Sequence, residues 1–167
     1  MSSIVPPPVA RWAATVCEVV ATEQIHQHCA VFIAVPGLDG LVLAGQLWGA
    51  GDDSGAVLVG EWVVPLHGSV CGRVYREGRP ALVADTSGDP EYRTYPGALA
   101  RSELAVPIVA AGETVGVLNL ESPRPATFRI VDLERSLDHA RRAGEAFAAA
   151  NLGALLGALL GSDDRTT

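Results

Sequence analysis

The residues best suited to binding chemistry stand at the two ends of one hairpin-like segment. Two apolar runs, 104–109 and 115–120, flank a short Ala-Gly-Glu turn, a pattern typical of a β-hairpin whose strands face a core. A hairpin that is buried along its middle and polar at its ends can present a small pocket to a ligand. The polar residues at these ends are Arg101, Ser102 and Glu103 on the first strand and Asn119 and Glu121 on the second.

Cysteine and histidine side chains offer two further kinds of chemistry. Cys71 could supply a thiol, but the three cysteines are an odd number without the spacing of a disulfide framework, which predicts a reduced, intracellular protein. His26 and His28 precede Cys29 and together carry donor types for a metal. No second cluster would complete four-coordination, so we expect solvated histidines, no metal and no cofactor.

Composition narrows the classes of partner. The chain has 167 residues, enough for one domain with a core, and is 49% hydrophobic but only 5% aromatic. Its net charge is −7 and its 12 basic residues include no lysine, which argues against nucleic-acid binding. No secretory signal opens the chain, and residues 146–161 are shorter than the ~20 residues of a membrane span. We therefore expect a cytoplasmic protein without a membrane partner.

Hydrophobic periodicity predicts an α+β fold with six mostly antiparallel strands. A helix should run from Val9 to Glu23, and a shorter one over 69–77 should end at Gly78. A long loop over 85–100 is a candidate functional segment because of its length. The strands are expected at 29–35, 41–48, 61–66 and 80–84, followed by the two hairpin strands.

The last helix, expected from Ile130 to Leu160, carries small and apolar residues at alternating steps of three and four. This seam favours a homodimer in which the first and last helices of two chains form a bundle. In the alternative, the seam packs on its own sheet and residues 152–161 fray. We divide the chain into a Pro-rich lead at 1–8, a domain at 9–150 and a helical extension with a disordered tail at 151–167.

Several motifs, in order and with matching spacing, resemble the GAF domain, a small-molecule sensory module of signalling proteins. They are His-Gly-Ser-Val-Cys-Gly-Arg from His67, Val-Ala-Asp from Val83, Asp-Pro-Glu-Tyr from Asp89, the segment from Arg101 to Pro107, and Gly-Val-Leu-Asn-Leu-Glu-Ser from Gly116. The resemblance covers about residues 8–150. It implies terminal helices on one face of the sheet and, on the other, a ligand pocket roofed by the middle helix and the long loop.

The resemblance also implies which residues line that pocket. Apolar walls with a few polar groups at the rim suit an unidentified small organic ligand. Arg73, Arg93 and Arg101 are candidate partners for an anion or carboxylate on that ligand. The implied pocket residues are Trp62, Val64, Leu66, Val70, Cys71, Val74, Tyr92, Tyr95, Arg101, Ser102, Glu103, Leu104, Asn119 and Glu121.

Some GAF proteins are free methionine-(R)-sulfoxide reductases with a similar Val-Cys-Gly, and their chemistry needs several thiols in one pocket. Aligned on them, Cys71 is retained, but the other two cysteine positions are occupied by Glu61 and Pro96. Their acidic pair falls at Asn119 and Glu121, one of which is uncharged. We therefore expect no catalytic residues and interpret Cys71 as a small pocket-lining residue.

The function expected is that of a stand-alone homodimeric binding module that signals to a separate partner protein. Two alternatives remain open. One is an enzyme of the reductase type that depends on Cys71. The other is a structural adaptor whose pocket is filled by Trp62, Tyr92 and Tyr95.

Overall fold

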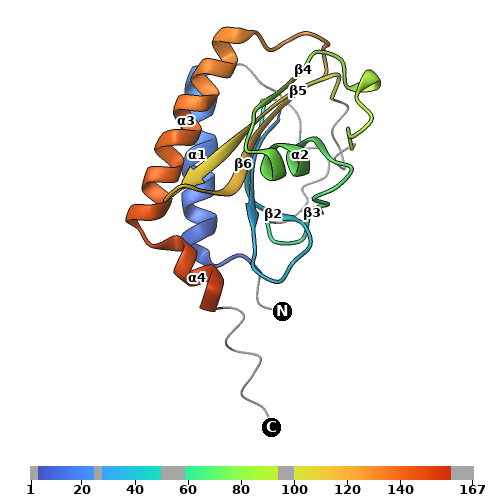
Figure 1. Ribbon diagram of the computed structural model, residues 1–167. Helices are drawn as coiled ribbons and strands as arrows, with labels where there is room; N and C mark the ends of the chain where they lie inside the picture. Colours follow the sequence, from blue (N-terminus) through green and yellow to red (C-terminus); the bar gives the residue numbers. More distant parts are fainter. Residues whose placement is uncertain (1–3, 25–27, 50–58, 94–99, 159–167) are drawn as a thin grey trace.

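The computed structural model describes residues 4–24, 28–49, 59–93 and 100–158. Figure 1 shows a single sheet with helices on both sides. The helices are α1 (Pro7–Glu23), α2 (Val70–Glu77), α3 (Ile130–Ala149) and α4 (Leu152–Ala158), with one 3₁₀ turn at Thr86–Gly88. The strands are β1 (His28–Ala34), β2 (Leu41–Trp48), β3 (Val63–Val64), β4 (Ala81–Val83), β5 (Ser102–Ala110) and β6 (Glu113–Ser122).

The six strands form one antiparallel sheet in the order β3-β2-β1-β6-β5-β4. The predicted hairpin is confirmed as β5 and β6, and both residues of its turn have positive φ, 51° at Ala111 and 84° at Gly112. Strand β6 pairs with β1 on its other side, so the polar end of the hairpin lies at the middle of the sheet. The fold is α+β, as expected.

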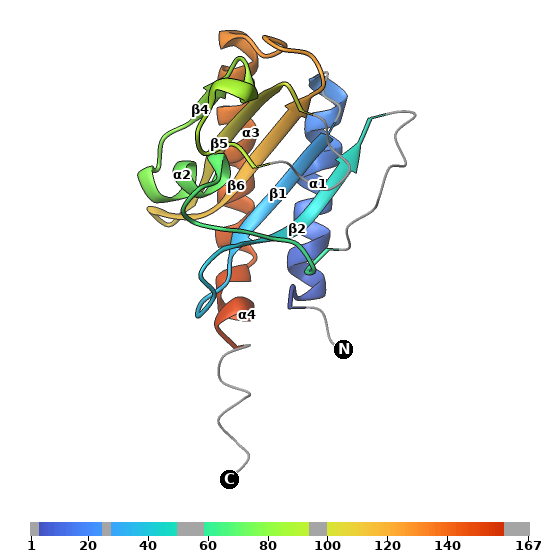
Figure 2. The same cartoon turned by 90° about the vertical axis from the view of Figure 1, so that its right-hand side faces the viewer.

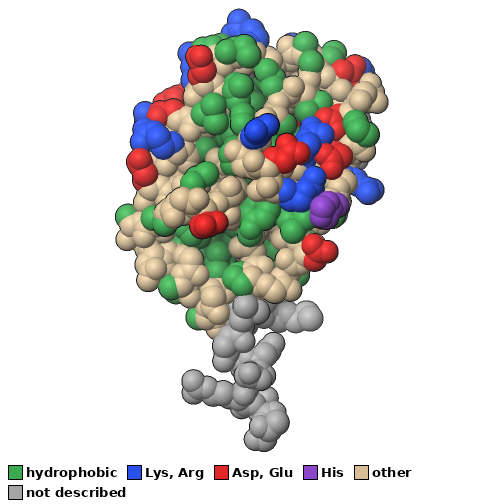
Figure 3. Space-filling model, viewed as in Figure 1, with side chains coloured by type: hydrophobic (Ala, Val, Ile, Leu, Met, Phe, Trp, Pro, Cys, Tyr) green, Lys and Arg blue, Asp and Glu red, His purple; other side chains and the backbone are tan. Residues whose placement is uncertain are grey.

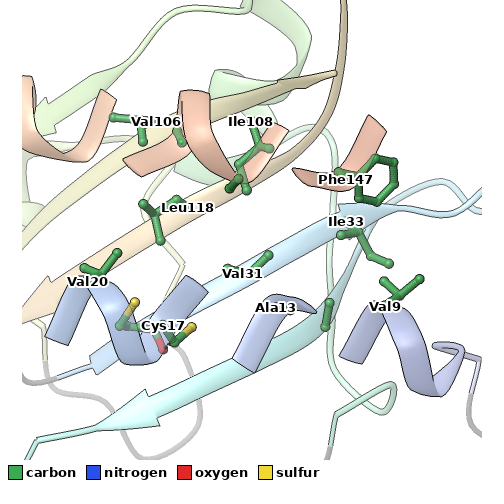
Figure 4. Close-up of a cluster of buried hydrophobic side chains, with 14 of the residues drawn as sticks. Val9, Ala13, Cys17, Val20, Val31, Ile33, Val106, Ile108, Leu118 and Phe147 are labelled. Carbon is green, nitrogen blue, oxygen red and sulfur yellow. Dashed lines mark hydrogen bonds between the residues drawn. The ribbon is translucent and has the colours of Figure 1, made fainter. Parts of the chain in front are cut away.

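Helices α1 and α3 cover one face of the sheet and α2 covers part of the other (Figures 1 and 2). Side chains alternate between the two faces along each strand. Val31, Ile33 and Leu118 therefore point toward α1 and α3, where they join a large core cluster with Cys17 and Phe147 (Figure 4). A second, smaller cluster lies between the sheet and α2.

Two glycines set how closely the long helices approach the sheet. A Cβ at Gly45 of β2 would lie 2.8 Å from the Cβ of Ala13 in α1. A Cβ at Gly144 of α3 would overlap the carbonyl oxygen of Val109 in β5. Both helices can lie against the backbone of the strands only because these positions lack a side chain.

Several predicted bounds differ from the structure. The expected third strand, 61–66, is shortened to Val63 and Val64, which pair with β2, although the Trp62 carbonyl also accepts from the Leu43 N–H at 2.8 Å. Helix α1 begins at Pro7 instead of Val9, since proline is tolerated in a first helical turn. Helix α2 begins one residue late because Ser69 is its N-cap.

The predicted continuous last helix is wrong at its C-terminal end. Asn151 adopts a left-handed conformation (φ 52°), which ends α3 and lets α4 start in a new direction. The small and apolar residues of the predicted seam do not share one environment. Ala140, Gly144 and Phe147 are buried on the sheet of the same chain, whereas Ile130 is 62% exposed. Leu159 and Leu160 lie outside the described residues. No helix in the described part of the chain combines the length and apolarity that crossing a membrane requires.

Candidate functional site

A cavity of about 30 Å³ lies between the sheet and the N-terminal end of α2. This exceeds the ~10–15 Å³ that a cavity needs in order to hold one water molecule. Three groups of residues line it: Phe32, Val64, Glu103, Asn119 and Glu121 from the sheet, Ser69, Val70 and Cys71 from the start of α2, and Trp62 and Arg93 from the flanking segments.

The start of α2 is held in place by local interactions. Ser69 caps the helix: its hydroxyl accepts from the Gly72 backbone N–H at 2.9 Å and donates to the Pro65 carbonyl at 2.6 Å. Gly72 has no side chain, and a Cβ there would collide with the carbonyl oxygens of Pro65 and Leu66. The helix therefore lies directly on the segment that follows β3 and closes one side of the cavity.

The floor of the cavity carries two carboxyl groups on neighbouring strands. Glu103 of β5 and Glu121 of β6 are register partners, so their side chains leave the same face of the sheet. Glu103 is 3% exposed and Glu121 is 4% exposed. Like charges placed directly opposite each other across two strands are destabilising, so this pair costs stability unless a cation or proton compensates it.

Burial and the neighbouring Glu121 raise the pKa of Glu103 well above its ordinary value. Burial also raises the pKa of the Cys71 thiol, and the nearby carboxylates of Glu103 and Glu121 add to this effect. The Cys71 Sγ lies 3.9 Å from Glu103 Oε1, to which the thiol donates. Cys71 is thus held as a neutral thiol, the form that is a poor nucleophile.

A series of side-chain contacts extends from Glu121 to His28 and Trp48. His28 Nδ1 is 3.3 Å from Glu121 Oε2, and His28 Nε2 is 3.1 Å from Gln46 Oε1. The imidazole also stacks on Trp48, with ring centroids 4.0 Å apart. The expectation of solvated histidines is wrong for His28, which is 1% exposed because β1 begins there and faces Glu121. His26 lies outside the described residues.

Asn119 adds a buried acceptor to the floor. It is 3% exposed and lines the cavity two residues from Glu121, on the same face of β6. Its Oδ1 has no hydrogen-bond partner in the described part of the chain. A buried, unpaired oxygen costs free energy in the absence of a donor, so this atom is suited to accept a hydrogen bond from a ligand.

The structure brings seven of the fourteen predicted pocket residues to the cavity. Leu66, Val74 and Tyr92 pack in the cluster behind the lining, and Tyr95 lies outside the described residues. Ser102 and Leu104 do not line the cavity, because on β5 they face away from Glu103, toward the α1–α3 core. The Ser102 hydroxyl instead donates to the Arg124 carbonyl at 2.7 Å. The predicted residues that do line the cavity are Trp62, Val64, Val70, Cys71, Glu103, Asn119 and Glu121.

The three candidate arginines have different surroundings. Arg73 forms hydrogen bonds of 2.7 Å and 3.1 Å to the Asp89 carboxylate and another of 3.0 Å to Glu91. Arg101 is half exposed and pairs with Asp85 at 3.1 Å, away from the cavity. Figure 3 shows basic and acidic side chains side by side on this part of the surface. Only Arg93 among the three lines the cavity.

The sheet separates the cysteines. Cys17 of α1 and Cys29 of β1 are buried in the cluster under α1 and α3, where the Cys17 thiol lies 3.8 Å from the Cys29 carbonyl oxygen (Figure 4). Cys71 belongs to the cluster on the opposite face. Neither Cys17 nor Cys29 can therefore form a disulfide with Cys71 within this fold.

One family model matches most of the chain. The model of the GAF domain matches residues 11–155. The chain belongs to the GAF domain family. GAF domains commonly bind small molecules and are mostly non-enzymatic.

Solved structures support the same fold for this GAF domain. The GAF domain of a phosphoenolpyruvate-protein phosphotransferase from Coxiella burnetii is 18% identical, with a TM-score of 0.76 over 90% of this chain and 88% of that one. The free methionine-R-sulfoxide reductase of Neisseria meningitidis, in complex with its substrate, is 22% identical, with a TM-score of 0.72 over 86% and 82%. The GAF-B domain of DevS from Mycobacterium smegmatis is 18% identical, with a TM-score of 0.67 over 85% and 94%. No curated protein sequence matches the chain.

Proposed function

We propose that this GAF domain is a non-enzymatic binding module for a small organic molecule that carries an ammonium group. The observation that carries this proposal is the pair Glu103 and Glu121, which lie buried side by side on the cavity floor. An ammonium group would offset negative charge at the pair and donate to the Asn119 Oδ1 at the same time. Phe32, Val64 and Val70 would provide an apolar wall for the rest of the ligand.

A small organic ligand needs the cavity to widen, because ligand pockets usually measure ~300–1,000 Å³. Trp62 and Arg93 come from segments outside helices and paired strands and border the cavity, so their side chains can move without unfolding the sheet. Ligand entry is expected to change the surroundings of Trp62 and therefore its fluorescence.

A thermal-shift series on the purified chain tests this function. The probes are alkylamines, amino acids and matched neutral alcohols, each at increasing concentration at pH 7. A ligand at 100 times its Kd stabilises a protein by about 2.7 kcal/mol, which corresponds to several degrees in Tm. Ammonium-bearing probes should raise Tm and the alcohols should not. Equal responses to both classes, or to neither, would contradict the proposal.

Cys71 is expected to be dispensable for binding. Its thiol is neutral and no described cysteine can reach it, so the Cys71→Ala variant should bind the same ligands within about threefold of the wild type, and neither protein should consume free methionine-(R)-sulfoxide with a dithiol reductant. Calorimetry and a sulfoxide-consumption assay measure the two properties. Consumption by the wild type that is lost in the variant would favour the thiol-dependent reductase instead.

We further propose that the domain acts in the cytoplasm as a homodimer. It would signal to a separate protein whether its ligand is bound. In support, a groove of about 420 Å³ runs between α1 and α3, with Trp12, Val16, Ala143 and Ala146 on its walls and Val19 42% exposed. An uncovered apolar groove between helices is suited to a helix of a second copy. Light scattering of the wild type and of Val19→Glu tests this, with a dimer expected for the first and a monomer for the second. A monomeric wild type would refute it.

A further inference from the structure

The cavity has two ends of opposite electrostatic character. The carboxyl groups of Glu103 and Glu121 lie on the sheet side. The first turn of α2 and the guanidinium of Arg93 border the same cavity from outside the sheet. A site with an acidic floor and a basic opposite side is complementary to a ligand that carries both charges.

Arg93 is held in position at the basic end. Its Nε donates to the Gly68 carbonyl at 2.7 Å, directly before the N-cap of α2. Gly68 has a φ of 77°, and a Cβ there would lie 3.2 Å from Arg93 Nη2, so glycine leaves room for the guanidinium. Neither Nη group of Arg93 has a hydrogen-bond partner within the described ranges. Both can therefore donate to an anion.

The first turn of α2 adds further donors. The backbone N–H groups of Val70 and Cys71 precede the first intrahelical hydrogen bond, so no carbonyl of the helix can accept from them. Both residues line the cavity, and the N-terminal end of a helix favours a negative charge. Independently, the buried Oδ1 of Asn119 can accept a hydrogen bond in the same cavity from a donor that the described residues do not supply.

We propose that the site selects a small zwitterion, with the ammonium group at Glu103 and Glu121 and the carboxylate between Arg93 and the first turn of α2. This inference rests on the proposed function and adds a second recognition element to it. Arg93 is then the residue that distinguishes a zwitterion from a simple amine. Arg73 and Arg101 cannot take this role, since acidic side chains already pair with them.

Calorimetry with two matched series tests the assignment. The first consists of L-alanine, ethylamine and propionate, and the second of L-leucine, 3-methylbutylamine and 4-methylpentanoate; within each, the side chain is constant and one charged group is removed at a time. The full chain should bind at least one zwitterion at least tenfold more tightly than the corresponding amine or acid. Arg93→Gln should weaken zwitterion binding by about tenfold or more and leave amine binding unchanged. Arg101→Gln, which removes the same charge away from the cavity, should change neither.

The outcomes separate this inference from the function on which it rests. If the amines bind as tightly as the zwitterions, or if Arg93→Gln preserves the preference, the zwitterion assignment is overturned while the ammonium site stands. An equal loss of amine and zwitterion binding in Arg93→Gln would show that Arg93 has a structural role, and it would overturn the assignment of Arg93 as the group that binds the carboxylate. If no member of either series binds the wild type, both the zwitterion assignment and the proposed function fail.

Discussion

Replacing Glu103 with glutamine should abolish binding of ammonium ligands and, at the same time, stabilise the ligand-free protein above neutral pH. Glutamine keeps the shape of the side chain but removes the charge that an ammonium group would pair with. It also removes the cost of ionising a carboxyl group that is buried beside Glu121. The two effects have opposite signs, which a general disruption of the site would not produce.

The pH dependence follows from the direction of the pKa shift. Burial raises the pKa of Glu103 in the folded protein, so below the unfolded pKa the carboxyl group is protonated in both states and contributes no difference. As the pH rises toward the folded pKa, only the unfolded chain releases the proton, and the wild type loses about 1.4 kcal/mol of stability per pH unit. The variant lacks this loss and should be more stable than the wild type at pH 8 but not at pH 4.

Urea unfolding at the two pH values measures this difference, which we expect to be on the order of 1 kcal/mol or more at pH 8. Glu113→Gln is the matched control, because Glu113 begins the neighbouring strand β6 but is exposed. That variant should show neither the gain in stability nor the loss of binding. A Glu103→Gln protein that binds amines normally, or that is less stable than the wild type at pH 8, would contradict the role given to Glu103.

Gly144→Ala should be the most destabilising single-methyl substitution in the long helices. The new Cβ would overlap the Val109 carbonyl oxygen and lie 2.8 Å from its carbon, so α3 must move away from β5. Alanine is the better helix former by about 1 kcal/mol, but forced displacement of a packed helix costs more. We expect a net loss of about 2 kcal/mol and a Tm lower by at least 4 °C.

Gly157→Ala is the matched control for this prediction. Gly157 is also helical, in α4, but a Cβ there meets no atom within 4 Å. The same substitution should therefore be neutral or stabilising by up to about 1 kcal/mol. Urea denaturation of the two variants with unchanged m-values would establish the difference, whereas equal stabilities would show that α3 can shift without cost.

Much of the site could be predicted from local pattern. Strict alternation along a strand places Glu103, Asn119 and Glu121 on one side of the hairpin once its turn is recognised. The same alternation could have excluded Ser102, which adjoins Glu103 and must therefore face the other way. Ser69, the first residue of the helix predicted over 69–77, could have been recognised as its N-cap, since a serine before a helix often accepts a hydrogen bond from the first turn.

His28 and Arg93 show what local pattern could not supply. His28 is buried because β1 pairs with β6 in a register that sets it opposite Glu121, and the two residues are 93 positions apart. The arginines at 73, 93 and 101 are equivalent as sequence, and only the placement of acidic side chains makes two of them unavailable.

The family, the hairpin and the polar rim are properties of short segments, which is why residue order and spacing are enough to predict them. Three features depend on the folded structure. They are the break in the last helix at Asn151, the register that places His28 opposite Glu121, and the position of Arg93 beside the cavity. Their free energies are set by packing and by the distances between charges, and these exist only once the chain has folded. The sequence therefore predicts a pocket in this domain, while the tertiary structure determines which charged groups border the cavity.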